Sequence, residues 1–382
     1  MKSKATVPVG GSGRSDVGPP ATVLGGMAMM VRPPSRQSKA SSRLLQELRA
    51  TLSGVIRLAI LGFWHVHAAD YAAEAGAHPE TEIVAAWDDD APRGEARARD
   101  LGARFHGDLP ELLARSDVDG VIVTTRTSAH PEVITAAADA GKHVFTEKVL
   151  ALTPPDAQRI TDAVERNGVK LTVSLPRLSH GYTIAIREVL ASGRLGEVTQ
   201  VRCRLAHDGA LGQPWLPGHF FDPAEAGGGA LVDLGCHPLY LTRLFLGGMP
   251  ESVSAEYGRV TGHAVDDNAA AILRHRTGAL GIAETGFVTP HSPFSIEVHG
   301  TKGSLMYGTP EPDLFVRTAP PGSDATWTQL PIPQSGPSPF EQWLGHIAQD
   351  TNATENIALA LDLTTLVDAA NRSALTGTAV RI

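Results

Sequence analysis

The feature that most constrains the fold of this 382-residue chain is an alternation of short apolar runs with helical segments between Val55 and Ser174. The run 55–61 ends at Gly62, a helical segment follows at 67–77, and a second apolar run occupies 81–87. Buried strands that alternate with helices require right-handed crossovers, which give a parallel sheet covered on both faces. The pattern predicts a doubly wound dinucleotide-binding domain over 54–175. Its other predicted strands lie at 120–124, 143–146 and 170–174, and its other helices at 92–101, 130–140 and 155–167.

The turn after the first strand departs from the usual dinucleotide fingerprint. It reads Gly62-Phe63-Trp64-His65-Val66-His67, so Trp64 and His67 occupy the second and third glycine positions of G-x-G-x-x-G. At the end of the next strand, Asp88 is placed to accept hydrogen bonds from an adenosine ribose and to repel a 2′-phosphate. This favours NAD over NADP, while the nearby Arg93 keeps NADP as the less favoured alternative.

His65 and His67 raise the question of a metal site. Two imidazoles at i and i+2 have no third ligand in view in the sequence, and zinc sites need at least three protein ligands. We therefore expect polar neighbours of the cofactor or substrate at these positions, and no metal.

The pattern changes after residue 175. Several consecutive strands without intervening helices predict an antiparallel sheet, so residues 176–382 form an α+β domain. An open sheet leaves one face in need of cover, which predicts a homodimer or homotetramer. The predicted strands lie at 197–205, 252–260, 268–274, 280–285, 294–299, 304–307 and 378–381, and the helices at 181–192, 340–349 and 356–373.

Two stretches carry candidate catalytic groups. The glycine-rich segment 227–237 leads into an apolar helix with Asp233 and His237 four residues apart, on one helix face. A carboxylate one turn from an imidazole can hold the ring and make it a positioned proton acceptor; a helix cap or a core pair is the structural alternative. Lys148 follows the strand 143–146, where substrate and nicotinamide would meet, although a lysine at a strand end can also be a solvated charge.

Several motifs match a known family in order between Val55 and Ile382, namely 121–125 with His130, 141–148, 193–198, 227–237 and 299–303. It resembles the glucose-fructose oxidoreductase / inositol 2-dehydrogenase (Gfo/Idh/MocA) family. The resemblance implies a Rossmann domain with an open antiparallel sheet, NAD(P)-dependent oxidation or reduction of a sugar or cyclitol hydroxyl, and oligomers assembled through the sheet face. It also implies that Lys148, matching E-K-P, and Asp233 with His237, matching D-x-x-x-H, are catalytic.

The sequence also departs from the family pattern. Val149 replaces the proline of E-K-P, Arg126-Thr127 replaces the usual Pro-Asn, and Tyr240 occupies an often acidic position. Arg177 stands where relatives often carry a cleft arginine. The expected cofactor contacts are Gly62, Phe63, Trp64, Asp88, Thr125, Arg126, His130, Glu147 and Lys148, and the expected substrate contacts are Lys148, Arg177, Asp233 and His237.

These groups suggest a mechanism in which His237 removes a hydroxyl proton as hydride leaves. Asp233 would fix the imidazole, and Lys148 would polarise the same oxygen. Two other classes of function stay open. One is non-redox glycoside cleavage or epimerisation with tightly held NAD, and the other is a catalytically silent sugar-sensing regulator. The presence of all three groups counts against the regulator.

Composition narrows the partners and the compartment. The net charge of -8 argues against nucleic-acid binding, and two cysteines without zinc-like spacing suggest a reducing cytoplasm. Residues 1–53 hold eight Lys/Arg against two Asp/Glu, without sustained apolar periodicity. This predicts disorder, or a start codon placed too far upstream, and neither a membrane span nor a secretory signal.

Overall fold

The computed structural model describes residues 54–212, 214–291, 293–318 and 326–382. The expectations for residues 1–53 therefore lie outside the described residues. No helix in these ranges is both long and apolar enough to cross a membrane.

The first sheet is the predicted doubly wound one. Its parallel strands have the order β3-β2-β1-β4-β5-β6, and the order reverses between β1 and β4. Ligands of such sheets bind at this switch point, outside the carboxyl ends of the strands. The strands are β1 (Ile56–Leu61), β2 (Thr81–Trp87), β3 (Arg104–His106), β4 (Gly120–Val123), β5 (His143–Thr146) and β6 (Leu171–Val173).

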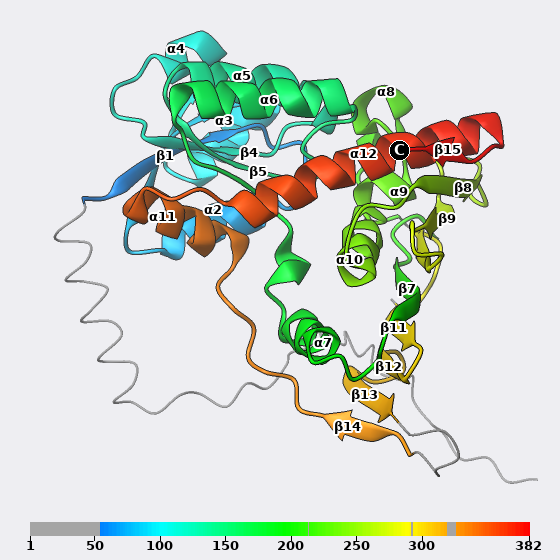
Figure 1. The fold of residues 1–382 in the computed structure, drawn as a ribbon. Helices are drawn as coiled ribbons and strands as arrows, with labels where there is room; N and C mark the ends of the chain where they lie inside the picture. The colour runs from blue at the N-terminus through cyan, green and yellow to red at the C-terminus, as the bar shows by residue number, and fades with distance from the viewer. Residues whose placement is uncertain (1–53, 213, 292, 319–325) are drawn as a thin grey trace, which may run out of the picture. The chain divides into compact units, whose positions relative to one another are not determined.

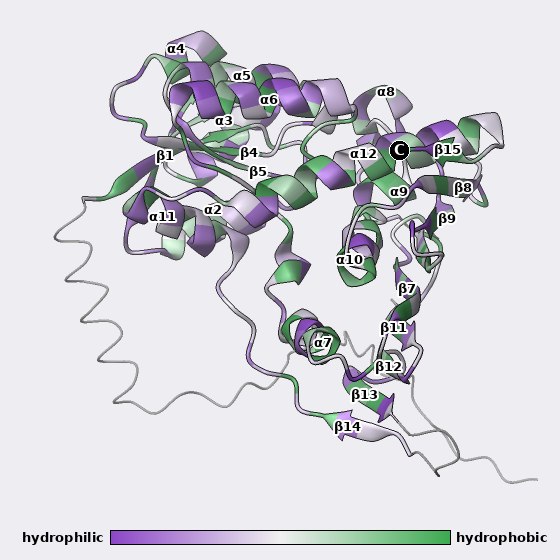
Figure 2. Ribbon diagram, viewed as in Figure 1, coloured by the Kyte–Doolittle hydropathy of each residue, from purple (hydrophilic) through white to green (hydrophobic). Residues whose placement is uncertain are grey.

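Helices cover both faces of this sheet, with α5 and α6 above the strands and α2 and α11 (Pro339–Gln349) below them in Figure 1. The interior residues of β1 and β4 are inaccessible to solvent, which explains their continuous apolar runs. Hydrophilic and hydrophobic stretches alternate along α6, as expected of a helix with one side on the sheet (Figure 2). The short β3 and α4 carry too weak a pattern to be predicted. The helices are α2 (Ala68–Ala77), α3 (Ala91–Asp100), α4 (Leu109–Leu113), α5 (His130–Asp139) and α6 (Pro154–Asn167).

The second sheet is mostly antiparallel, as predicted, but β7 and β10 pair in parallel. The chain leaves β7, crosses over through α10 (Cys236–Leu246), and returns as the meander β8-β9-β10, whose last strand then lies beside β7. The strand order is β14-β13-β12-β11-β7-β10-β9-β8-β15. The strands are β7 (Val198–Ala206), β8 (Ser252–Gly258), β9 (Asn268–Arg274), β10 (Leu280–Gly286), β11 (Phe294–Gly300), β12 (Gly303–Gly308), β13 (Asp313–Thr318), β14 (Thr328–Leu330) and β15 (Val380–Arg381).

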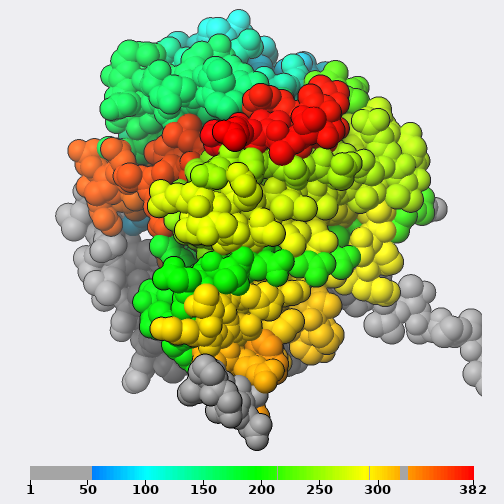
Figure 3. Space-filling view, turned by 45° about the vertical axis from the view of Figure 1, so that its right-hand side comes forward, coloured from blue at the N-terminus to red at the C-terminus, as the bar shows by residue number. Residues whose placement is uncertain are grey.

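The two faces of the second sheet differ in their cover. One face packs against α7 (Gly181–Ala191), α10 (Cys236–Leu246) and α12 (Thr354–Thr376). On the other face the strands form parallel bands of colour on the molecular surface, with the green band of β7 between yellow bands (Figure 3). Ile272, Leu280 and Met306 are 48%, 39% and 40% exposed.

The C-terminal helices return to the first sheet, although their sequence position assigns them to the second domain. Helix α11 (Pro339–Gln349) packs on β5 and β6, and the Trp343 indole donates to the Lys170 carbonyl at 3.1 Å. Asn356, in the first turn of α12, bonds both backbone groups of Val173 at 2.8 and 2.9 Å. Helix α12 then runs on to β8 (Figure 1). The described residues therefore pack as one unit, with no boundary at residue 175 for these helices.

Candidate active site

A buried ion pair joins the two sheets at the centre of the site. Lys148 follows β5, and its ammonium donates to the Asp233 carboxylate at 2.8 Å and to the Asp233 carbonyl at 2.5 Å. The Lys148 side chain is 4% exposed and that of Asp233 is 22% exposed. Burial disfavours the ammonium, but the carboxylate outweighs burial and raises the pKa of Lys148. Burial likewise opposes the carboxylate, and Lys148 lowers the pKa of Asp233 below its usual range.

The glycine-rich segment before Asp233 is anchored by one carboxylate. Asp266 accepts the backbone N–H groups of Gly229 and Leu231, each at 2.9 Å. A Cβ at Gly229 would lie 2.0 Å from the Asp266 carbonyl oxygen, so only glycine fits there. This anchoring sets the start of the short helix α9 (Ala230–Asp233) and so the position of its last residue.

His237 has a different partner from the predicted one. The sequence predicts one helix through Asp233 and His237, whereas the structure ends α9 at Asp233 and begins α10 at Cys236. His237 Nδ1 lies 3.1 Å from the hydroxyl of Tyr240, which also accepts the backbone N–H of Arg177 at 3.2 Å. Tyr240 rather than Asp233 therefore positions the ring. Burial, and then the charges of Arg177 and Lys148, lower the pKa of His237 well below its usual value, so the imidazole is neutral.

His65 and Glu147 lie next to the Lys148–Asp233 pair. The ring of His65 lies between two carboxylates: Nδ1 is 3.5 Å from Glu147 Oε1, and Nε2 is 3.4 Å from Asp233 Oδ1. Tyr71, on α2, has its hydroxyl 2.7 Å from both Glu147 Oε1 and Ser174 Oγ. Burial opposes ionisation of Glu147, but His65 and Lys148 lower its pKa below its usual value. Sequence reasoning missed Tyr71, which matches no motif, and it noted Tyr240 only as a departure from the family pattern, without its role beside His237.

A cavity of about 230 Å³ brings the reactive groups together. Arg177 is not among its lining residues: its guanidinium donates to the Tyr182 hydroxyl at 3.2 Å and stacks 4.5 Å from the Phe294 ring centroid. It therefore acts on the cavity through its charge. The cavity is lined by His67, Asp70, Tyr71, Glu74, Phe145, Glu147, Lys148, Ser174, Pro176, His237, Ser338, Pro339 and Phe340.

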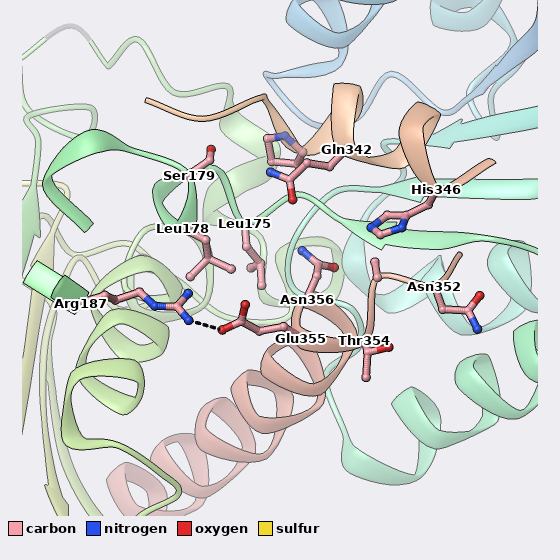
Figure 4. A pocket seen from close by; sticks show the side chains of 12 residues that line it. Leu175, Leu178, Ser179, Arg187, Gln342, His346, Asn352, Thr354, Glu355 and Asn356 are labelled. Atoms are coloured by element: carbon pink, nitrogen blue, oxygen red, sulfur yellow. Dashed lines mark ion pairs between the residues drawn. The ribbon is translucent and has the colours of Figure 1, made fainter. Parts of the chain in front are cut away.

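A separate cavity of about 390 Å³ is lined by residues of α7, α11 and α12 and the segment 175–179 (Figure 4). Arg187 and Glu355 face each other there in an ion pair at 2.9 Å. Because neither Lys148 nor His237 reaches it, this cavity is not the site of the predicted chemistry.

The turn after β1 is built on Gly62 and Asp88. Gly62 has φ +88°, and a Cβ there would lie 2.6 Å from the Thr125 methyl group. Asp88 accepts the backbone N–H of Phe63 at 2.7 Å and both Nε and Nη2 of Arg93 at 2.9 and 2.6 Å. Its side chain is fully buried, so it holds the turn and leaves no acceptor for a ribose, contrary to the role predicted from the sequence. Arg93 is engaged by the same contact.

The neighbouring Asp89 borders an apolar cleft of about 640 Å³ at the carboxyl ends of β2 and β4. Arg126 forms an ion pair with Asp89 at its rim. His130 lies below, fully buried, with its nitrogens 3.0 Å from the Val149 carbonyl and 3.3 Å from the Thr125 carbonyl. Burial lowers the pKa of His130 to about 4. Thr125 and His130 therefore support the turns around the cleft from below. The other lining residues are Trp87, Leu109, Pro110, Leu113, Ala114, Ala129, Glu132, Val133, Ala136 and Ala140.

Trp64 closes the region between this turn and Lys148. Its indole stacks on Phe220 with ring centroids 4.7 Å apart and donates to Glu225 at 2.8 Å. His219 Nε2 lies 3.0 Å from the Trp64 carbonyl. Only about 10 Å³ of space remains between this cover and Lys148. Phe220 and Ala226 line this space together with Trp64 and Lys148.

Comparison with known proteins places this architecture in a family. Residues 56–175 match the model of the oxidoreductase family with an NAD-binding Rossmann fold, and residues 183–306 match the GFO/IDH/MocA C-terminal domain. The chain is 33% identical to the 1,5-anhydro-D-fructose reductase of Ensifer adhaerens over 228 residues, 59% of this chain and 68% of that protein. The chain belongs to the Gfo/Idh/MocA family.

Other similarities agree with this assignment. The Gfo/Idh/MocA chain is 29% identical to the scyllo-inositol 2-dehydrogenase (NAD⁺) of Bacillus subtilis, over 66% of this chain and 74% of that protein. Levoglucosan dehydrogenase in complex with NADH and levoglucosan shares the fold, with a TM-score of 0.74 at 20% identity, over 86% of this chain and 99% of that one. The resemblance predicted from the motifs is confirmed, and this Gfo/Idh/MocA protein is an NAD(P)-dependent oxidoreductase.

Proposed function

We propose that this Gfo/Idh/MocA protein transfers hydride between NAD and a hydroxyl-bearing carbon of a sugar, cyclitol or sugar derivative. The observation that carries the proposal is the convergence of a buried ammonium, Lys148, and a neutral imidazole, His237, on one cavity. When bound, the nicotinamide supplies the hydride acceptor or donor. The protein groups have only to bind the substrate oxygen and move its proton.

The two groups suit complementary roles. Lys148 stays protonated because Asp233 raises its pKa, so it serves as a charged hydrogen-bond donor to the substrate oxygen. His237 is neutral because its pKa is lowered, so it can accept the hydroxyl proton. Tyr240 positions the ring, and Asp233 keeps Lys148 charged.

Adenosine is proposed to occupy the apolar cleft beside Asp89. A ribose diol there would donate to the Asp89 carboxylate, which is the exposed neighbour of the buried Asp88. The same carboxylate would repel a 2′-phosphate, which supports NAD rather than NADP. Arg126 moderates that repulsion through its ion pair with Asp89.

The substrate class is supported by the lining of the cavity and by the relatives. Asp70, Glu74, Ser174 and Ser338 add carboxylate and hydroxyl groups that can bond several substrate hydroxyls. The relatives named above are a reductase of an anhydro-sugar and an inositol dehydrogenase. No feature of the described residues favours the two alternatives, non-redox catalysis and sugar sensing.

A homodimer or homotetramer is proposed to form through the open face of the second sheet. Burial of the exposed Ile272, Leu280 and Met306 in such an interface would stabilise the oligomer. Both cysteines, Cys203 and Cys236, are free and buried, which suits a reducing cytoplasm.

The proposal is tested by screening sugars, polyols and inositols with NAD and NADP, following absorbance at about 340 nm, the band of reduced nicotinamide. At least one compound of this panel should be turned over, and Lys148→Ala should lower the kcat for that substrate by about 10²-fold. Arg194→Ala, whose side chain contacts none of these cavities, is the matched control. Turnover without net change in NADH would instead indicate the non-redox class.

A further inference from the structure

Three potential metal ligands meet at the edge of the active site. The nearest ligand atoms of His65, His67 and Glu147 all lie within 4.8 Å of one another. The two histidines come from the turn after β1 and the glutamate from the end of β5. The sequence offers the histidines no third ligand, and the fold brings one. We propose that this His–His–Glu cluster binds one divalent transition-metal ion, such as Zn²⁺, Mn²⁺ or Co²⁺.

The spacing between His65 and Glu147 already matches metal coordination. His65 Nδ1 and Glu147 Oε1 are 3.5 Å apart. Two ligand atoms at about 2.1 Å from a tetrahedral ion lie roughly 3.4 Å from each other. These two atoms therefore need almost no movement to share an ion.

Neighbouring side chains contact all three ligands. His65 Nε2 is buried, has no hydrogen-bond partner, and lies 3.4 Å from Asp233 Oδ1. His67 Nδ1 lies 2.9 Å from the Asp70 carboxylate. Tyr71 bonds Glu147 Oε1 at 2.7 Å. In metal sites, carboxylate–histidine contacts and hydrogen-bonded carboxylates of this kind help to orient the ligands.

The donor set and charges select the class of ion. Two imidazoles and one carboxylate suit zinc and its first-row neighbours, whereas Mg²⁺ and Ca²⁺ prefer oxygen ligands alone. Lys148 would repel the ion, but its charge is offset by Asp233 at 2.8 Å. His67, whose side chain is 47% exposed, can rotate to close the remaining distance.

The remaining coordination positions face the cavity that holds Lys148 and His237, because His67 and Glu147 line it. A hydroxyl or carboxylate oxygen of a bound molecule could complete the coordination shell there. This last point rests on the proposed function; metal binding itself does not.

Titration tests the proposal on the tag-free full chain, stripped with a chelator. Calorimetry with Zn²⁺, Mn²⁺ and Co²⁺ should show one site per chain, and the visible absorption of bound Co²⁺ should report imidazole ligation. His65→Ala, His67→Ala and Glu147→Gln should each weaken binding by at least about 10-fold. His299→Ala, on the second sheet, should leave it unchanged.

The decisive variant is His67→Ala, since this exposed side chain can be removed without unfolding the protein. A wild-type cooperative unfolding transition, followed by circular dichroism, confirms that each variant is folded. Failure of the wild-type protein to bind any of the three ions, or equal binding by wild type and His67→Ala, would overturn the proposal. Because no substrate is present, these outcomes are independent of the sugar oxidoreductase assignment.

Discussion

Replacing Asp233 by asparagine should separate the role of its charge from that of its shape. Two unit charges 2.8 Å apart attract by about 6 kcal/mol at an effective dielectric constant of about 20. Desolvation offsets most of this attraction, so the intact pair contributes little net stability. Asp233→Asn removes the attraction and leaves the Lys148 ammonium buried alone, which costs about 3–5 kcal/mol in comparable pairs. The amide oxygen can still accept one bond and the site is 22% exposed, so we expect about 3 kcal/mol.

The measurement is the free energy of unfolding in urea at pH 7. The folded pKa of Lys148 is raised, so its contribution is present at low pH and lost as pH rises above about 10. The folded pKa of Asp233 is lowered, so its contribution is lost as pH falls below about 4. At pH 7 both contributions are complete.

A double variant provides the control. Lys148→Met with Asp233→Leu removes both charges and should recover most of the lost stability, although not activity. The reasoning would be refuted if Asp233→Asn were as stable as the wild-type protein within about 0.5 kcal/mol, or if the double variant were less stable than either single one.

Three further outcomes are expected. His237→Ala should lower kcat by about 10²-fold with little change in NAD affinity. Because the pKa of the His237 ring is lowered, the rate of oxidation by the wild-type protein should fall only at a pH below about 6.5, which a pH–rate profile would show. Asp89→Ala should free Arg126 for a 2′-phosphate and raise NADP affinity relative to NAD by about 10-fold in calorimetry, whereas Asp100→Ala on the outside of α3 should not. Ile272→Asp should reduce the mass in light scattering to that of a monomer, and an unchanged mass would show that the sheet face is not the interface.

Much of the fold was predictable because it depends on local periodicity. Continuous apolar runs indicate strands that are buried on both faces, and runs of alternating apolar and polar residues indicate strands with one covered face. These patterns predicted the first sheet and most strands of the second. They did not predict β3, which has three residues, or the parallel pairing of β7 with β10, which depends on how distant strands are arranged.

The sequence by itself determined which groups are available for chemistry, whereas the tertiary structure decided which of them meet. The spacing predicted that Asp233 contacts His237. Because the helix is interrupted before Cys236, Asp233 instead pairs with Lys148, 85 residues away, and His237 contacts Tyr240. Asp88 matched the ribose-binding position, but packing buries it under the turn. The approach of Glu147 to His65 joins the ends of two different strands. The periodicity of a sequence indicates which residues are buried. Which residue each of them contacts across a sheet edge depends on strand order and turn geometry, which no local pattern encodes.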